Sequence, residues 1–249
     1  MQRSVYYYKS VKSDQAFLKQ RIKEIAYSRI HYGYRRIHIV LLREGFHLGR
    51  KTVLKLYQEL NLQMRRCKPK RRVQVKPRLE DTPITKKNDA WAIDFVADVL
   101  TTGECLKILT VVDLYTRESP IIGVKFSYKA EDVIFSLEEG IILHGFPKMI
   151  RLDNGPEFIS KALDIWAYKY GIILDFTRPG KPTDNAYIES FNSRLRQKCL
   201  NQHWFLNLED AKFKVELWQR DYNSHRPHSS LGYKSPQEFA NSLAGTECI

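Results

Sequence analysis

The positive charge of this 249-residue chain is concentrated in its first third, and this division implies two modules of different character. Residues 1–78 contain 21 Lys and Arg against 4 Asp and Glu, a net charge of +17. The remaining residues contain 20 against 24, a net charge of −4. Solubility alone gives no reason for such a segregation, so the basic module indicates a polyanionic partner.

The first module, residues 1–64, carries apolar residues at helical spacing in three segments. The periodicity predicts helices over residues 14–30, 33–44 and 50–60, and Gly45 ends the second of them. Two short helices joined by a glycine-containing turn resemble a helix-turn-helix, although a purely structural bundle has the same pattern. The charge favours DNA binding. The candidate contacts are Arg35, Arg36, Arg50, Lys51 and Lys55.

A basic linker is predicted over residues 65–81. Residues 65–78 hold eight basic residues and two prolines without apolar periodicity, which is typical of an extended segment. Such a segment can be a solvated tether, a strand that follows a phosphate backbone, or both.

The second module, residues 82–245, changes to a pattern of strands followed by alternating strands and helices. This order predicts an α/β core of the ribonuclease-H-like type, preceded by the small all-α module. The expected strands are 90–99, 105–115, 119–126, 149–153 and 171–176, and the expected helices are 130–145, 157–170, 184–200 and 207–223.

Three acids of this module are candidates for catalysis and metal binding. Asp94 interrupts an apolar strand, where a charge is costly to bury without a partner or a metal. Asp153 closes a short strand, at the end that commonly faces a ligand crevice, and Glu189 lies within a predicted helix. Carboxylates are the ligands that Mg²⁺ and Mn²⁺ prefer, and two such ions about 4 Å apart can clamp a phosphodiester. The acids therefore predict metal-dependent phosphoryl transfer.

The helix that carries Glu189 has a polar face. Asn185, Glu189, Asn192 and Arg196 follow one another at intervals of four, three and four residues, within roughly 60° of one another around the helix. The two amides and the arginine suit contacts with DNA near the scissile phosphate. An ordinary amphipathic helix with a solvated polar face is the alternative.

Other acids have weaker claims to a catalytic role. Asp98 and Asp113 are interpreted as supporting or solvent-facing, and Asp184 as a residue that precedes the Glu189 helix. Glu157 is expected to start a helix, where the dipole favours a carboxylate. The cysteines form no CxxC pair and are expected to be free thiols. They are Cys67, Cys105, Cys199 and Cys248.

With these residues in place, the sequence resembles the transposases of the IS3 family of bacterial insertion sequences, specifically the product of their second reading frame. Asp153 and Glu189 are separated by 35 residues, as in the family's D-D-35-E arrangement, and Arg196 matches the basic residue seven positions after the glutamate. The matching blocks are WAIDF (91–95), LDNGPEF (152–158), residues 178–201, the C-terminal signature at 222–236 and the helix-turn-helix region at 31–62.

The resemblance implies a retroviral-integrase-like catalytic fold, a divalent metal, and double-stranded DNA of transposon terminal repeats and target as substrate. It implies cleavage and strand transfer by direct phosphoryl transfer, without a covalent enzyme intermediate. The implied partners are an upstream-frame protein or fusion and further copies of the chain. The implied location is the bacterial cytoplasm, at the nucleoid, without a membrane.

Two other functions are compatible with parts of the sequence. A non-catalytic DNA-binding regulator would explain the basic module, but it leaves Asp94 unexplained. A ribonuclease-H-like nuclease acting on hybrids would share the metal chemistry, but it gives no role to the first module or to the C-terminal signature.

Overall fold

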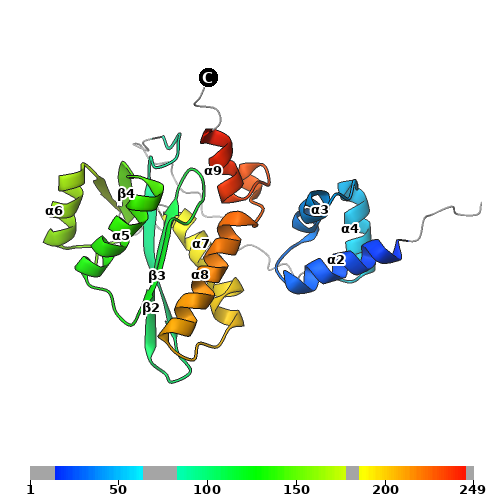
Figure 1. Ribbon diagram of the computed structural model, residues 1–249, viewed down its shortest axis with the longest axis horizontal. Coiled ribbons are helices and arrows are strands. Elements are labelled where there is room, and N and C mark those ends of the chain that lie inside the picture. The colour runs from blue at the N-terminus through cyan, green and yellow to red at the C-terminus, as the bar shows by residue number, and fades with distance from the viewer. Residues whose placement is uncertain (1–14, 64–82, 178–184, 245–249) are drawn as a thin grey trace, which may run out of the picture. The chain divides into compact units, whose positions relative to one another are not determined.

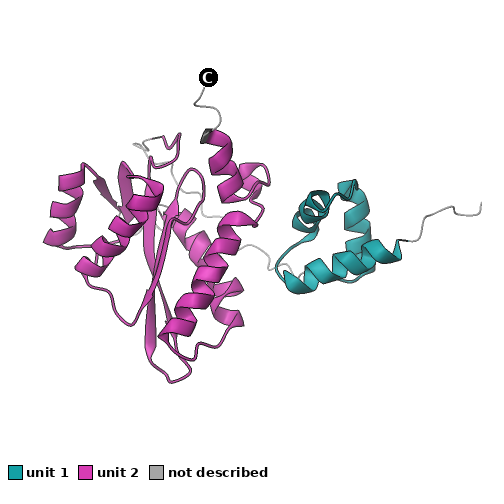
Figure 2. Ribbon diagram, viewed as in Figure 1, with its two compact units in different colours: residues 1–72 teal, residues 73–249 magenta. Residues whose placement is uncertain are grey.

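The computed structural model describes residues 15–63, 83–177 and 185–244. Its contacts divide the chain into two compact units, Met1–Arg72 and Val73–Ile249, which are considered separately (Figure 2). The predicted linker at 65–81 and Asp184 lie outside the described residues. Within the described ranges, no helix combines the length and the apolar character that crossing a membrane requires.

The described part of the first unit is a three-helix bundle, which confirms the three predicted helices. They are α2 (Ala16–Ser28), α3 (Tyr34–Arg43) and α4 (Arg50–Glu59). Each helix buries one apolar stripe against the other two. The buried side chains of these stripes are Ile22, Ile25, Ile37, Leu41, Val53, Leu56 and Tyr57.

The turn between α3 and α4 is short and tightly held. Gly45 adopts a positive φ of 88°, a conformation that favours glycine, directly after α3. A ring nitrogen of His38 lies 2.8 Å from the carbonyl oxygen of Leu48, which fastens the turn to α3. The pair α3–α4 therefore has the helix–turn–helix connection that the sequence predicts.

The second unit is built on a five-stranded sheet with the order β3-β2-β1-β4-β5. The strands β1, β2 and β3 form an antiparallel meander, while β4 and β5 run parallel to β1. The strands are β1 (Trp91–Val99), β2 (Cys105–Asp113), β3 (Ile121–Lys125), β4 (Met149–Leu152) and β5 (Ile173–Phe176).

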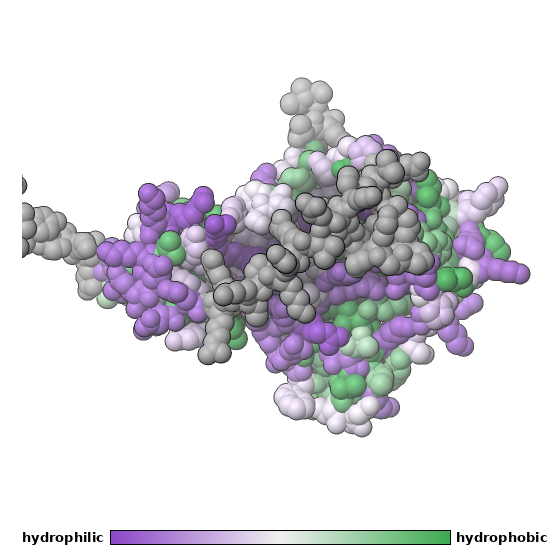
Figure 3. All heavy atoms as spheres, turned by 180° about the vertical axis from the view of Figure 1, so that it is seen from behind, coloured by the Kyte–Doolittle hydropathy of each residue, from purple (hydrophilic) through white to green (hydrophobic). Residues whose placement is uncertain are grey.

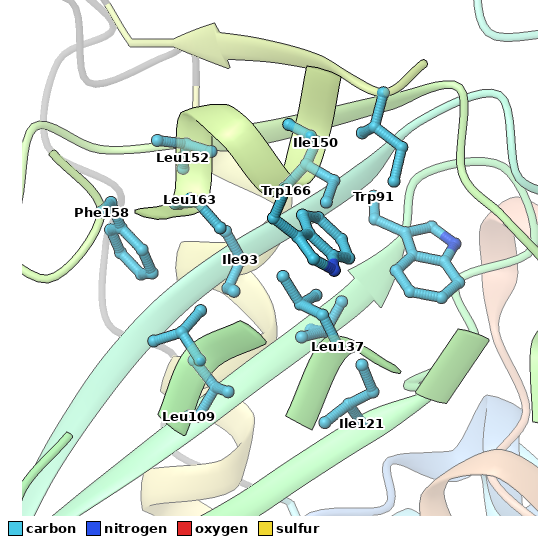
Figure 4. Packing of buried hydrophobic residues seen from close by; sticks show 14 of the residues in the cluster. Trp91, Ile93, Leu109, Ile121, Leu137, Ile150, Leu152, Phe158, Leu163 and Trp166 are labelled. Atoms are coloured by element: carbon cyan, nitrogen blue, oxygen red, sulfur yellow. The ribbon is translucent and has the colours of Figure 1, made fainter. Parts of the chain in front are cut away.

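Helices cover both faces of the sheet (Figure 1). The helices α5 (Ala130–His144) and α6 (Lys161–Tyr170) lie on one face, where Leu137 and Trp166 pack against Trp91 and Ile93 of β1 (Figure 4). The other face is covered by α7 and α8. Because side chains alternate along a strand, β1 supplies both cores. Ala92 and Val96 point to the α7–α8 face.

The C-terminal part consists of α7 (Ala186–Lys198), the 3₁₀ turn η2 (Leu200–Gln202), α8 (Leu208–Ser224), the 3₁₀ turn η3 (Ser229–Leu231) and α9 (Pro236–Ala244). An aromatic cluster joins α7 to α8, with Phe191 packed edge-on against Trp218 and Tyr222 at ring-centroid distances of 5.4 and 4.9 Å. This packing sets the position of α7, the helix that carries Glu189, against the sheet.

The prediction that Glu157 starts a helix is wrong, because α6 begins at Lys161. Residues 155–159 form a turn instead, in which the N–H groups of Phe158 and Ile159 donate to the Gly155 carbonyl at 3.0 and 3.1 Å. The Ser160 side chain then caps α6 by accepting from the Leu163 N–H. Glu157 instead forms an ion pair with Lys107 of β2.

Gly140 marks a close approach between α5 and β3. A Cβ atom at this position would lie 2.2 Å from Cγ1 and 2.3 Å from Cδ1 of Ile121. We therefore expect Gly140→Ala to lower the free energy of unfolding by about 1–3 kcal/mol through overpacking, despite the better helix propensity of alanine. The urea-induced unfolding transition of the second unit measures this loss.

The control for this prediction is the same change in an Ile121→Ala background, in which both crowded atoms are absent. The penalty of Gly140→Ala should vanish there, giving a coupling energy between the two positions. An equal cost in both backgrounds would show that the close contact is not its cause.

Candidate active site

The sheet brings the first two predicted carboxylates together. The parallel register that pairs Trp91 with Ile150 and Ala92 with Arg151 also relates Asp94 to Asp153, which directly follows β4. Both aspartates extend from the sheet face that α7 and α8 cover. Residues that are distant in the sequence therefore become neighbours through the pairing of β1 with β4.

Asp94 is held by two hydrogen bonds. Its Oδ1 accepts from the backbone N–H of Phe95 at 2.8 Å, and its Oδ2 accepts from Nδ2 of Asn192 at 2.8 Å. The Asn192 side chain is itself oriented, because its Oδ1 accepts from the Thr110 hydroxyl at 2.8 Å. Thr110 lies opposite Asp94 in the β1–β2 register. Two strands and α7 thus fix the orientation of one carboxylate.

The electrostatics of Asp94 show that the three predicted acids share one environment. Burial is the largest cause that raises the pKa of Asp94, to about 6, against the opposing hydrogen bond from Phe95. The negative charges of Asp153 and Glu189 raise it further, while the Asn192 amide lowers it. The acids are therefore close enough for their charges to repel.

Asp153 lies in a turn that leaves its carboxylate accessible. Its Oδ1 accepts from the Gly155 N–H at 3.0 Å. A Cβ atom on Gly155 would lie 3.0 Å from this Oδ1 and 3.4 Å from Oε2 of Glu157. Glycine therefore keeps the space beside the carboxylate open.

Glu189 lies in the first turn of α7 and is exposed to solvent. None of the ion pairs between described residues includes Glu189, Asp94 or Asp153. Within the described ranges, no three His, Cys, Asp or Glu side chains are close enough together to hold one metal ion. The donor set nevertheless has the chemistry that hard divalent cations require, namely carboxylate oxygens that form no ion pair with a cation of the described residues.

The polar face of α7 makes contacts with the sheet. Besides the Asn192 amide, Nη2 of Arg196 donates to the Ala97 carbonyl of β1 at 2.8 Å, although Arg196 remains exposed. Asn185 precedes α7, and its side-chain Oδ1 is buried without a hydrogen-bond partner. The sequence placed these residues on one helical face, but it did not indicate that Asn192 would support Asp94.

A lysine–glutamate pair that the sequence analysis missed connects the Asp153 turn to the sheet. Nζ of Lys107 pairs with Glu157 and lies 4.3 Å from the ring centroid of Phe95. Phe95 in turn stacks on Phe158, with ring centroids 5.0 Å apart. The sequence signal for this pair was a lysine within the mostly apolar β2, but its partner lies 50 residues away in the sequence.

The other acids stay outside this cluster. Asp113 is only 2% exposed and accepts hydrogen bonds from the backbones of Asn88, Tyr115 and Thr116, so it supports the fold. Asp98 is partly exposed and accepts from the N–H of the next residue.

The two cysteines within the described ranges, Cys105 and Cys199, are free thiols, as expected. Cys199 is buried, and burial raises the pKa of its thiol to about 12, which makes it unreactive at neutral pH.

The face of the first unit in the view of Figure 3 is largely hydrophilic. Arg50, Lys51 and Lys55 of α4 are exposed, and the two lysines line a groove together with Lys19 of α2. On α3, the predicted contacts lie beside aromatic rings. The guanidinium carbons of Arg35 and Arg36 lie 5.8 and 5.7 Å from the ring centroids of Tyr34 and Tyr32, respectively.

Both units match models of known protein families. An HTH-like domain matches residues 12–72, and two models of the integrase core domain match residues 84–182 and 170–236. The catalytic core domain of HTLV-2 integrase, in a structure with magnesium, superimposes with a TM-score of 0.51 at 18% identity, covering 61% of this chain and 96% of that domain. The predicted ribonuclease-H-like, integrase-type fold is therefore confirmed.

Relatives among insertion-element proteins extend over almost the whole chain. A 31.7 kDa protein of insertion element IS407 from Burkholderia multivorans is 42% identical over 96% of this chain and 87% of its own length. The InsK protein of insertion sequence IS150 from Escherichia coli, named as a transposase, is 28% identical over 96% of this chain and 89% of its own length. The chain thus belongs to the IS3 family of insertion-sequence transposases, as a second-reading-frame protein with a DDE integrase core.

Proposed function

We propose that Asp94, Asp153 and Glu189 are the catalytic carboxylates with which this transposase cleaves insertion-sequence ends and joins them to target DNA. The observation that carries the proposal is the environment of Asp94. Its carboxylate is oriented by Asn192, and its pKa is raised by the charges of Asp153, which directly follows β4, and of Glu189. The 35-residue spacing of the last two acids matches the family arrangement.

The three carboxylates would hold Mg²⁺ or Mn²⁺, and we propose two ions. The magnesium in the HTLV-2 integrase structure supports a hard cation on this fold. When bound, such ions supply Lewis-acid stabilisation of the charge that develops on the phosphate during displacement. The contribution of the chain would be to supply three carboxylates, from β1, from the turn after β4 and from α7, and to hold Asp94 in a fixed orientation through Asn192.

The DNA substrate that we propose is double-stranded, with terminal repeats bound by the first unit and target DNA joined at the carboxylates. Arg35, Arg36, Arg50, Lys51 and Lys55 would contact the repeats, mainly at phosphates. Asn192 and Arg196 lie on the Glu189 helix and Asn185 directly precedes it, and Asn185 and Arg196 would contact DNA near the scissile phosphate. The Asn192 amide is engaged with Asp94 and Thr110, so its contribution to DNA binding would be indirect.

The assembly that we propose contains further copies of the chain and an upstream-frame protein, free or fused, because two ends must be cut together. It would act in the bacterial cytoplasm, at the nucleoid.

The experiment that tests this function is nicking and strand transfer on labelled terminal-repeat DNA, with Mg²⁺, with Mn²⁺ and with EDTA. The chain is assayed alone and fused to the upstream-frame product. We expect metal-dependent products in at least one of the two forms. DNA binding without nicking or transfer in both forms would favour the non-catalytic regulator, and cleavage of only the RNA strand of a hybrid would favour a ribonuclease-H-like nuclease.

Asn192→Ala tests whether orientation of Asp94 contributes to the activity. The substitution removes the amide that donates to Asp94 and accepts from Thr110. We expect a 10–100-fold loss of metal-dependent nicking and a higher metal requirement, as for other residues that orient metal ligands. Metal titrations of the nicking rate measure both effects.

Ser193→Ala on the same helix is the matched control, since Ser193 is exposed and makes only a 3.5 Å contact with Gln197. It should retain the wild-type metal requirement. If Asn192→Ala also retained it, the amide would have no role in holding the ligand.

A further inference from the structure

A groove of the catalytic unit, with a volume of about 440 Å³, lies apart from the three carboxylates. Its walls combine two arginines with aromatic and apolar side chains, and they contain no acid. The lining residues are Pro83, Ile84, Leu114, Tyr115, Arg117, Arg151, Tyr187, Ser230, Leu231 and Phe239. The composition of these walls favours an anionic ligand that also offers apolar surface.

Arg117 is the groove residue with a buried hydrogen-bond donor that no described residue satisfies. Its guanidinium carbon lies 3.7 Å from the ring centroid of Tyr187, which orients the group over an aromatic face. Its Nη1 is buried and has no hydrogen-bond partner. A buried donor without an acceptor costs free energy, and the planar fork of an arginine matches the oxygens of a phosphate group.

Arg151 adds a second positive group to the groove. It is 8% exposed, and its Nε donates to the Asp175 carboxylate at 2.9 Å, so its charge is partly balanced from outside the groove. Arg117 has no such ion pair with a described residue. The uncompensated charge of the groove therefore lies at Arg117.

The groove shares two structural elements with the carboxylate cluster. Arg151 precedes Asp153 by two residues along β4, and Tyr187 precedes Glu189 by two residues along α7. Two residues of a strand extend about 7 Å. The edge of the groove at Arg151 therefore lies about two nucleotides from Asp153 at the rise of a DNA strand.

Two residues of the C-terminal signature at 222–236 form part of one wall of the groove. Ser230 and Leu231 of η3 line the groove, and Phe239 of α9 packs against Tyr115 with ring centroids 5.7 Å apart. The signature thereby acquires a structural place beside the active site, although none of its residues belongs to the carboxylate cluster.

We propose that this groove binds a phosphodiester of the DNA strand that leaves the carboxylates, with Arg117 as its main contact. The inference rests on the proposed function, because it takes the strand in the active site to be DNA. The aromatic and apolar walls would lie against sugar and base, while the guanidinium neutralises one phosphate.

The test is binding of the full-length chain to labelled terminal-repeat DNA in EDTA over a series of KCl concentrations. Removal of one phosphate contact lowers the slope of log K against log [salt] by about one. We expect this decrease for Arg117→Ala, together with weaker binding by about 5–10-fold at low salt, and a nearly unchanged slope for Arg117→Lys. Arg220→Ala is the matched control, because Arg220 is exposed on α8 and does not line the groove.

A second measurement uses DNA in which single phosphates are replaced by neutral methylphosphonates. Wild type should lose affinity at one position near the cleaved phosphate, and folded Arg117→Ala should be insensitive there. An unchanged salt slope in folded Arg117→Ala would overturn the inference. So would a wild-type scan without such a position, which decides the matter if the variant does not fold.

The two proposals fail in different ways. Binding is read without metal, so loss of the Arg117 effect leaves nicking by the wild type intact. Absence of metal-dependent nicking, with the Arg117 effect present, would instead contradict the proposed catalysis.

Discussion

Glu189→Gln is expected to reduce metal-dependent cleavage of terminal-repeat DNA by about 10³-fold or more. Glutamine preserves the size of the side chain and removes the charged oxygen that a divalent cation requires. A bound metal contributes several kcal/mol to transition-state stabilisation, and each 1.4 kcal/mol corresponds to a tenfold change in rate. The loss should therefore appear in the chemical step.

Because Glu189 is exposed, an effect of its substitution on cleavage can be separated from an effect on folding. The side chain is exposed on α7 and takes part in none of the ion pairs between described residues, so the substitution should leave thermal unfolding unchanged. The measurement is a single-turnover nicking rate at saturating metal. Glu216→Gln, on the exposed surface of α8, serves as the control for loss of one negative charge. Activity of Glu189→Gln within a few-fold of wild type would exclude a catalytic role.

Asp94→Asn is expected to stabilise the metal-free protein while it abolishes activity. The pKa of Asp94 is raised by burial and neighbouring charges from an ordinary 3.8 to about 6, so its ionised form is disfavoured in the folded state. Protonation of Asp94 therefore stabilises the fold below pH 3.8, and this stabilisation is lost as the pH rises through 6. Above pH 6, the difference between the two pKa values corresponds to a cost of about 3 kcal/mol for the ionised aspartate, and asparagine avoids this cost but loses one of the two hydrogen-bond acceptors.

Urea unfolding in EDTA at several pH values measures this effect. The advantage of Asp94→Asn should be small near pH 4, grow between pH 4 and 6, and remain constant above it. Added Mg²⁺ should stabilise wild type at pH 8 but not the variant, because binding to the folded state adds stability. Equal stability of wild type and variant at pH 8 in EDTA would contradict the raised pKa.

The result expected for Asp94→Asn expresses a conflict between stability and function. Burial is the largest cause that raises the pKa of Asp94, and the charges of Asp153 and Glu189 raise it further. An ionised carboxylate in this position costs stability when no cation is bound beside it, which is common where a site is organised for a ligand.

Much of this arrangement follows from local sequence pattern. The apolar runs of β1 and β2, which are covered on both faces of the sheet, and the helical spacing in α2, α3 and α4 can be read from short windows of sequence. Local pattern was insufficient at α6. There the turn at residues 155–159 is stabilised by its own backbone hydrogen bonds, so the helix starts four residues later than expected.

By itself, the sequence determined the order of the elements, the two modules and the identity of the three candidate acids, because these depend on residue type and short-range spacing. Only the tertiary structure decided which side chains meet. The register of β1 with β4 relates Asp94 to Asp153, and the packing of α7 on the sheet brings Asn192 to Asp94. The pairing of Lys107 with Glu157 likewise depends on a contact across 50 residues. Such contacts arise from the packing of whole elements, which no local period of the sequence encodes.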